Sequence, residues 1–186
     1  MTHDFSPIDD ADWPAEAAGL RDGFAGALNV YRCMAHHPRL LNAWAPLREH
    51  LVRQPSLTPQ QSEIVILRAG HRLGSEYEWA HHVHRARKLG MADARIARIA
   101  GPTAEMEGED GLLARAVDEL FDDRRLSRTT QAGLDTPLGP QGMLDLIATV
   151  GFYSVLGFML RSFDTPLDAD VAREMAARPL PRPDQP

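Results

Sequence analysis

The sequence predicts a single all-α domain, and three observations support this prediction. Apolar residues recur with helical periodicity along most of the chain, and no stretch alternates apolar and polar residues for long enough to form a sheet. Capping residues, glycines and prolines separate the periodic segments. The chain has 186 residues, 44% of them hydrophobic, which is enough for one domain with a substantial core.

The N-terminal part of the chain is expected to form an arm followed by two helical segments. Residues 1–16 contain several aspartates and no apolar run, so a flexible arm is expected there. A first helical region covers about residues 17–36. Pro38 ends this region and opens a second helix, which runs to about Val52. Pro55 then marks a linker.

Two start signals near the middle of the chain predict a tight helical hairpin. The sequence TPQQ at residues 58–61 supplies a capping residue, a proline at the first helical position and a glutamine that can reach back. The helix that begins there is expected to run to about Arg72, before Gly74 breaks it. The sequence SEYE at residues 75–78 is a second capping box, and Gly90 suits the left-handed position that ends the second helix.

The C-terminal half continues the helical pattern. Segment 126–138 is ambiguous, with a short helix possible before Pro137. The tail, residues 179–186, holds four prolines in eight residues and is expected to be disordered, which leaves 17–178 as the helical domain. The other helices are expected at about residues 93–100, 111–121, 141–163 and 168–177.

Composition and charge exclude several classes of function. The formal net charge is −6 and no block of Lys or Arg occurs, so no nucleic-acid partner is expected. Cys33 is the only cysteine, which excludes an internal disulfide and a Cys-x-x-Cys redox centre. The arm lacks the features of a secretion signal, and the apolar stretch 146–160 is shorter than the roughly 20 residues of a membrane span. We therefore expect a cytoplasmic protein with no membrane partner.

The second helix of the hairpin carries the residues with the clearest chemical meaning. Glu78 and His82 are four residues apart, so they share one helix face. A carboxylate beside an imidazole can transfer protons near neutral pH. Because the helix dipole favours a charged carboxylate in the first turn, we expect Glu78 to be ionised and His82 to donate the proton.

Other interpretations of this helix stay open. Glu78 can serve only as the third residue of the capping box, without a catalytic role. His81 and His84 are expected on the solvated face, and Trp79 in the core or in a pocket wall. The Glu78-x-x-His81 spacing is the one used by di-iron bundles, but no second such motif occurs, so no metal site is expected.

Four segments of the chain carry a family resemblance. The hairpin sequence LTPQQSEIVILRAGHRLGSEYEWAHHVHRARKLGM, together with VYRCMAHHPRLLNAW, LLARAVDELFDDRRLS and GFYSVLGFML, resembles the carboxymuconolactone decarboxylase family. It is also similar to the AhpD-like alkylhydroperoxidases of the same superfamily. The resemblance covers about residues 17–170 and is specific in the hairpin, where Glu78, Trp79 and His82 match the Glu-Trp-x-x-His pattern of the decarboxylase-like branch.

The resemblance also implies which chemistry is absent. The peroxidase branch has Cys-x-x-Cys-x-x-x-His at this place, preceded by a glutamate on the previous helix. Its two cysteines align with Ser75 and Glu78, its histidine with His82 and its glutamate with Glu63. Peroxide reduction needs a thiolate and a partner that resolves it, so alkylhydroperoxidase activity is not expected. Glu63, Glu78 and His82 remain as catalytic candidates.

The resemblance implies a cofactor-independent decarboxylation or proton shift on a small carbonyl or lactone-bearing acid. His82 would donate the proton, Glu78 would orient and charge it, and Glu63 would tune the pair. Arg68 is a further candidate for holding a substrate carboxylate. The candidate substrate-binding residues are Ser75, Trp79, Tyr153 and Arg85.

The resemblance further implies an AhpD-like helical fold and a homo-oligomer, either a dimer or a trimer of dimers. The long apolar helix at 141–163 is compatible with this, because a neighbouring copy could cover it. Two alternatives to the decarboxylase stay open. One is another acid/base lyase, isomerase or hydrolase on the same scaffold, and the other is a non-catalytic helical oligomer.

Overall fold

The computed structural model describes residues 3–180 and confirms the all-α prediction, because this part of the chain contains helices and no strand. Three short 3-10 turns accompany the α-helices: η1 (Asp10–Asp12), η2 (Ala15–Ala17) and η3 (Thr103–Glu105). The α-helices are α1 (Ala18–Arg21), α2 (Phe24–Ala27), α3 (Asn29–Met34), α4 (Pro38–Arg53), α5 (Pro59–Leu73), α6 (Glu76–Lys88), α7 (Asp93–Ile99), α8 (Gly108–Asp122), α9 (Arg128–Ser162) and α10 (Ala169–Ala177).

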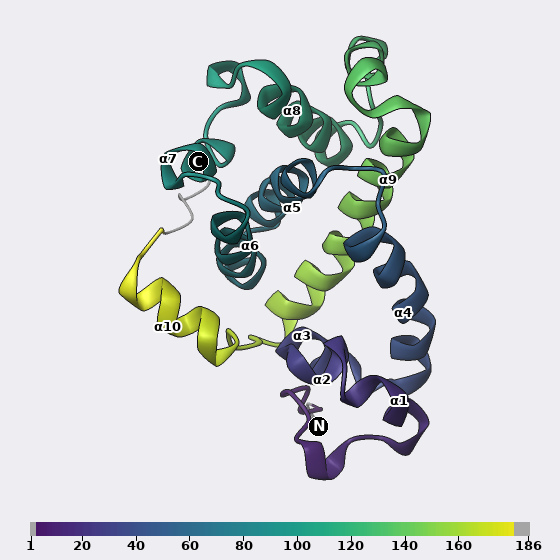
Figure 1. The fold of residues 1–186 in the computed structure, drawn as a ribbon. Coiled ribbons are helices and arrows are strands. Elements are labelled where there is room, and N and C mark those ends of the chain that lie inside the picture. The colour runs from purple at the N-terminus through teal and green to yellow at the C-terminus, as the bar shows by residue number, and fades with distance from the viewer. Residues whose placement is uncertain (1–2, 181–186) are drawn as a thin grey trace.

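Helices α5 and α6 form the predicted hairpin at the centre of the molecule (Figure 1). Thr58 caps α5 in a complete capping box with Gln61, and Gly74 ends the helix in the left-handed conformation, at φ 64°. Ser75 caps α6 by accepting the backbone N–H of Glu78. The reciprocal half of this second box does not form, because the backbone N–H of Ser75 binds the carbonyl of Gly70 instead. The Glu78 side chain is therefore free for another role.

Helix α5 is the central helix of the core. It packs against α6, α7, α8 and α9, and nearly all its side chains from Gln61 to Leu73 are buried. Gly70 permits close contact with α6, because a Cβ at this position would lie 3.2 Å from Cβ of Glu78. Because the two helices approach closely at this point, the first turn of α6, which carries Glu78, packs against the centre of α5.

The segment 126–138, for which the sequence gave no clear prediction, contains the first part of α9. Residues 128–138 are helical and continue into the predicted apolar helix, with a kink at Gly139, where φ is 62° and ψ is −176°. The helix is long and apolar enough to cross a membrane by length and composition alone. Half of its most apolar window is buried inside the protein, however, as in the core helix of a soluble domain.

The two ends of the described chain contact the helical domain. The ring of Phe5 stacks on Phe163, and the guanidinium of Arg32 donates to the carbonyl of Ile8. At the other end, the carbonyl of Leu180 accepts a hydrogen bond from Nε1 of Trp79. These contacts place residues 3–16 and 179–180 against the domain. The expected disorder of residues 181–186 lies outside the described residues.

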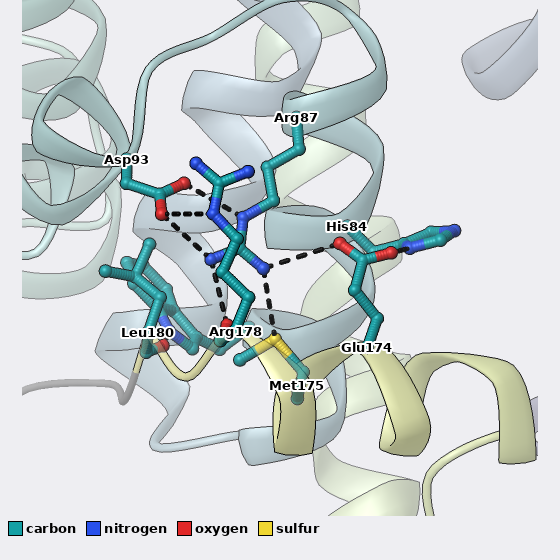
Figure 2. A network of polar contacts seen from close by, with 8 residues as sticks. His84, Arg87, Asp93, Glu174, Met175, Arg178 and Leu180 are labelled. Atoms are coloured by element: carbon teal, nitrogen blue, oxygen red, sulfur yellow. Dashed lines mark hydrogen bonds and ion pairs between the residues drawn. The ribbon is translucent and has the colours of Figure 1, made fainter.

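Helix α10 is held against α6 by polar contacts at both of its ends. Figure 2 shows the outer part, where Arg87 lies between Asp93 and Glu174, and Arg178 also pairs with Asp93. Glu174 pairs in addition with His84. His84 is therefore half-buried in an ion pair, and the expectation that it is simply solvated was wrong.

A second polar cluster fixes the start of α10. The Asp168 carboxylate accepts hydrogen bonds from the backbone N–H of Asn29 at 2.9 Å, from the Tyr77 hydroxyl at 2.8 Å and from Nε2 of His81 at 2.7 Å. Burial alone would raise the pKa of Asp168, but these hydrogen bonds lower it. The cluster joins α3, α6 and α10 in one buried network.

We expect Asp168→Ala to reduce the free energy of unfolding by about 3 kcal/mol, because two buried donors and one part-buried donor lose their acceptor at once. Urea denaturation followed by circular dichroism measures the change. Asp170→Ala is the matched control, since Asp170 lies exposed in the first turn of the same helix. Equal stability of the two variants would contradict a structural role for this network.

Candidate active site

Three of the predicted residues, Glu63, Glu78 and His82, meet between α5 and α6. Oε2 of Glu63 lies 2.7 Å from Nδ1 of His82, and Oε2 of Glu78 lies 3.5 Å from Nε2 on the other side of the same ring. All three side chains are buried. The imidazole is thus held between two carboxyl groups that come from different helices, an arrangement suited to passing a proton.

Glu78 is the residue with the most unusual environment. It is only 3% exposed, and its Oε1 atom is buried without a hydrogen-bond partner among residues 3–180. Burial raises the pKa of Glu78 to about 8, and the charge of Glu63 adds to this, while Arg85 opposes it. Glu78 is therefore a carboxylic acid at neutral pH. The expectation of an ionised Glu78 was wrong, because desolvation outweighs the helix dipole at this depth.

His82 is neutral at the same pH. Burial lowers its pKa, and the carboxylate of Glu63 only partly opposes this effect. Since Glu63 accepts at Nδ1, the proton of the neutral ring lies on that nitrogen. The lone pair on Nε2 then faces the protonated Glu78. The acid and the base are consequently reversed relative to the sequence-based hypothesis.

An open cavity of about 490 Å³ adjoins this group of residues. Its wall is largely apolar, with Glu63, Tyr153 and three cationic side chains, those of Arg53, Arg85 and Lys88. A small inner hollow of about 20 Å³, room for about one water molecule, lies beyond it and is lined by Glu78 and His82. The residues common to both linings are Val52, Arg85 and Tyr153, so they form the boundary between the two spaces.

Arg85 and Tyr153 are the predicted substrate-binding residues that the structure places at the site. In the described part of the chain, no residue hydrogen-bonds to the Arg85 guanidinium. Burial alone would lower the pKa of Arg85, but Tyr153 and Glu63 raise it overall, so the side chain stays charged. The ring of Tyr153 packs edge-on against His82, with centroids 5.0 Å apart. Both side chains can therefore reach an anionic ligand.

The sequence did not identify two further residues of the inner hollow, Tyr31 and Arg48. The Arg48 guanidinium lies 4.1 Å from the ring centroid of Phe24 and is buried. Burial raises the pKa of Tyr31 to about 12, so its hydroxyl remains a donor. In the sequence, only the family resemblance of residues 30–44 indicates that this region is important. The spacing of residues along the chain does not connect this region with α6.

The other predicted residues lie elsewhere. Ser75 caps α6 and does not line either space. Trp79 belongs to the apolar core and binds the carbonyl of Leu180. Arg68 forms an ion pair with Asp118, in which Nη2 and Oδ2 are 2.6 Å apart, and donates hydrogen bonds to two backbone carbonyls. Its guanidinium is therefore not available to bind a substrate.

His81 is buried, and the expectation that it lies on the solvated face was wrong. Its Nδ1 donates to the carbonyl of Tyr77 at 2.8 Å and its Nε2 to Asp168 at 2.7 Å. Both ring nitrogens are thus occupied on the side of α6 that faces α10, and Glu78 does not share a ligand site with His81. Across residues 3–180, no three His, Cys, Asp or Glu side chains are grouped so that they could hold a metal ion.

Comparison with known families confirms the resemblance inferred from the sequence. Residues 38–119 match the model of the carboxymuconolactone decarboxylase family, a range that includes Glu63, Glu78 and His82. No curated protein matches the chain in sequence.

Solved structures share the fold across nearly the whole chain. An uncharacterized peroxidase-related protein from Silicibacter sp. TM1040 has a TM-score of 0.73 at 13% identity, covering 92% of this chain and 97% of its own. A protein from Ralstonia eutropha JMP134, described as an alkylhydroperoxidase AhpD core, has a TM-score of 0.72 at 14% identity, covering 91% and 96%. The debrominase Bmp8, in complex with 2,3,4-tribromopyrrole, has a TM-score of 0.69 at 14% identity, covering 95% and 98%. At such identities these structures establish the AhpD-like fold alone.

Proposed function

We propose that this chain, which belongs to the carboxymuconolactone decarboxylase family through residues 38–119, catalyses acid/base chemistry on a small carbonyl or lactone-bearing acid. The reaction is a decarboxylation or a proton shift that proceeds without a cofactor. The proposal rests on one observation: the buried side chains of Glu63, His82 and Glu78 contact one another in that order, and Oε1 of the protonated Glu78 has no hydrogen-bond partner among the described residues.

The cavity supports an acidic substrate of modest size. Its volume of about 490 Å³ lies within the range of small-molecule sites. Lys88 and Arg53 line its wall and can attract a carboxylate, whereas Arg85 lies deeper, at the boundary with the inner hollow. A guanidinium without a hydrogen-bonding partner in a mostly apolar wall favours a ligand that supplies the missing negative charge.

The chemistry of a decarboxylation assigns a role to each side chain. When the bond to the carboxylate breaks, its electron pair passes into the adjacent carbonyl and forms an enolate as CO2 leaves. Arg85 and the Tyr153 hydroxyl can stabilise the enolate oxygen. Glu78 then gives its proton to carbon. Its acid form is restored when Nε2 of His82 takes up a proton from solvent and passes it to the Glu78 carboxylate. In a proton shift, His82 instead accepts a proton from one carbon while Glu78 donates to another. Nε2 of His82 then passes its new proton to the Glu78 carboxylate, so that the enzyme returns to its starting state.

Two alternatives remain beside this proposal. Another lyase, an isomerase or a hydrolase could use the same three groups, because each of these reactions needs a paired acid and base. A non-catalytic helical oligomer would need no buried acid beside a base, so the burial of Glu78 weighs against it. Peroxide reduction is disfavoured because Ser75 and Glu78 occupy the positions of the two cysteines.

The test is a screen of small keto acids, lactone acids and unsaturated acids in D2O, with CO2 release and deuterium incorporation as readouts. We expect at least one compound to react with the wild-type protein. His82→Asn should react about 10²-fold more slowly, because the amide can still donate to Glu63 but cannot carry a proton. Glu76→Gln, an exposed change in the same helix, should leave the rate unaltered. Equal rates for His82→Asn and wild type would refute the assignment.

A further inference from the structure

The inner hollow beside the candidate active site is lined by two cationic side chains. Arg48 reaches it from α4 and Arg85 from α6. Tyr31 and Tyr153 add two phenol side chains to its wall. Glu78 is the one acidic residue in this lining, and it is uncharged at neutral pH because burial raises its pKa to about 8. Among the described residues, none that lines the hollow therefore carries a negative charge.

Arg48 has an unusual environment for a buried cation. It is only 9% exposed, and its Nε atom has no hydrogen-bond partner in the described part of the chain. Its guanidinium lies over the rings of Phe24 and Tyr31, with Cζ 4.1 Å and 5.9 Å from the two centroids. Its ion pair with the exposed Glu49 is long, with 4.0 Å between Nη1 and Oε2. A buried guanidinium with an unused donor is destabilising unless a ligand accepts from it.

Two carboxylates near the hollow are occupied by other partners. Oε2 of Glu63 lies 2.7 Å from Nδ1 of His82, and Glu63 does not line the hollow. Oδ2 of Asp168 lies 2.7 Å from Nε2 of His81. Both carboxylates are thus paired with histidines and not with the guanidinium groups of the hollow. A negative charge that binds these guanidinium groups directly has to come from a ligand.

The size of the hollow selects a ligand of one atom. Its volume of about 20 Å³ holds about one water-sized particle, so a phosphate or a whole carboxylate is too large. A water molecule fits, but it cannot neutralise two guanidinium groups. Chloride and bromide are only slightly larger than water and accept hydrogen bonds from N–H and O–H groups. We propose that the hollow binds one halide ion between the guanidinium groups of Arg48 and Arg85.

The outer cavity gives a halide ion a route to this site. Val52, Arg85 and Tyr153 belong to both linings, so the two spaces adjoin there. Arg53 and Lys88 line the outer wall. Because cationic side chains in a largely apolar cleft raise the local concentration of anions, the approach to the hollow favours a halide over a cation.

A halide ion in the hollow also affects the proposed reaction. Arg85 and Tyr153 are the groups assigned to the enolate oxygen, so the ion and this oxygen compete for one place. This consequence rests on the proposed function, whereas the halide site does not. Bromide should raise the KM of a reacting substrate and leave kcat unchanged. If bromide binds in the hollow but leaves KM unaltered, the enolate oxygen lies elsewhere and only the halide site stands.

Chloride NMR tests the site without a substrate. The full chain is titrated with sodium chloride in a gluconate buffer of constant ionic strength, and the chloride line width is measured. Wild type should broaden the line saturably, and bromide should reverse the broadening. Arg48→Met should weaken binding by about 10- to 100-fold, the usual effect of losing a hydrogen bond to a charged group.

Arg53→Met is the matched control for this titration, because Arg53 is an exposed cation of the outer wall that does not line the hollow. It should bind chloride nearly as wild type does. Absence of saturable broadening in the wild type would overturn the proposal. Equal losses in Arg53→Met and Arg48→Met would also overturn it, because the broadening would then report only the general positive potential of the cavity.

Crystals soaked in sodium bromide locate the ion directly. We expect an anomalous peak between the guanidinium groups of Arg48 and Arg85, and we expect this peak to be lost in Arg85→Met. Arg85 is only half-buried, so this second variant keeps the test valid if Arg48→Met fails to fold. Bromide found only at surface positions, with water in the hollow, would overturn the proposal.

Discussion

Glu78→Gln is expected to lower the turnover of a reacting substrate by between about 10² and 10⁴-fold, the usual contribution of a general acid. Glutamine has nearly the shape of the protonated glutamic acid that the buried site holds at neutral pH. The variant should therefore keep the cavity, the contact to His82 and substrate affinity. Only the transferable proton is lost, so the effect should fall on kcat and leave KM nearly constant.

Single-turnover measurements across pH 5 to 10 check this result. In the wild type the rate should fall as pH rises through the pKa of Glu78, which is about 8, because the acid form disappears. Glu76→Gln changes the same residue type two positions earlier, on the exposed surface, and should retain both the rate and its pH profile. If Glu78→Gln turns over at the wild-type rate, the proton comes from another group and His82 becomes the first candidate.

The sequence was sufficient to predict the hairpin and its catalytic candidates. Local signals determine this region: Thr58 and Ser75 cap their helices, and Gly74 supplies the positive φ between them. The four-residue spacing of Glu78 and His82 then fixes their common face. Glu63 could be included among the catalytic candidates only through the family resemblance. No signal in the local sequence predicts that a side chain of α5 contacts Nδ1 of His82 on α6.

The errors share one physical cause, which is that burial depends on distant segments. His81 was expected to be solvated, but α10 and Asp168, 87 residues later, cover it. The charge of Glu78 was predicted from the helix dipole, a local effect, whereas desolvation by surrounding helices decides its protonation. Arg48 went unnoticed for the same reason, since α4 brings it to the inner hollow from outside the hairpin.

The second large effect concerns the free energy of unfolding. Glu78→Gln is expected to stabilise the fold at neutral and higher pH, although it lowers turnover. Glu78 has an ordinary pKa of 4.5 in the unfolded chain and a pKa of about 8 in the folded protein. Between these values the unfolded state has released the proton and the folded state retains it, so the free energy of unfolding falls as pH rises through this window. Integrated over the window, the loss amounts to about 5 kcal/mol as an upper bound.

Glu78→Gln should abolish this loss, because an amide does not titrate. The stability difference between variant and wild type should be near zero at about pH 4.5, grow in favour of the variant up to about pH 8, and remain constant above it. Urea denaturation of both proteins at several pH values measures this difference. The titration of all other groups contributes equally to both proteins and cancels, provided that the substitution leaves the environments of those groups unchanged. A variant that is more stable yet inactive would indicate that the buried acid is kept for chemistry at the expense of the fold. A pH-independent difference would mean that Glu78 titrates normally, and the proton donor would have to be sought elsewhere.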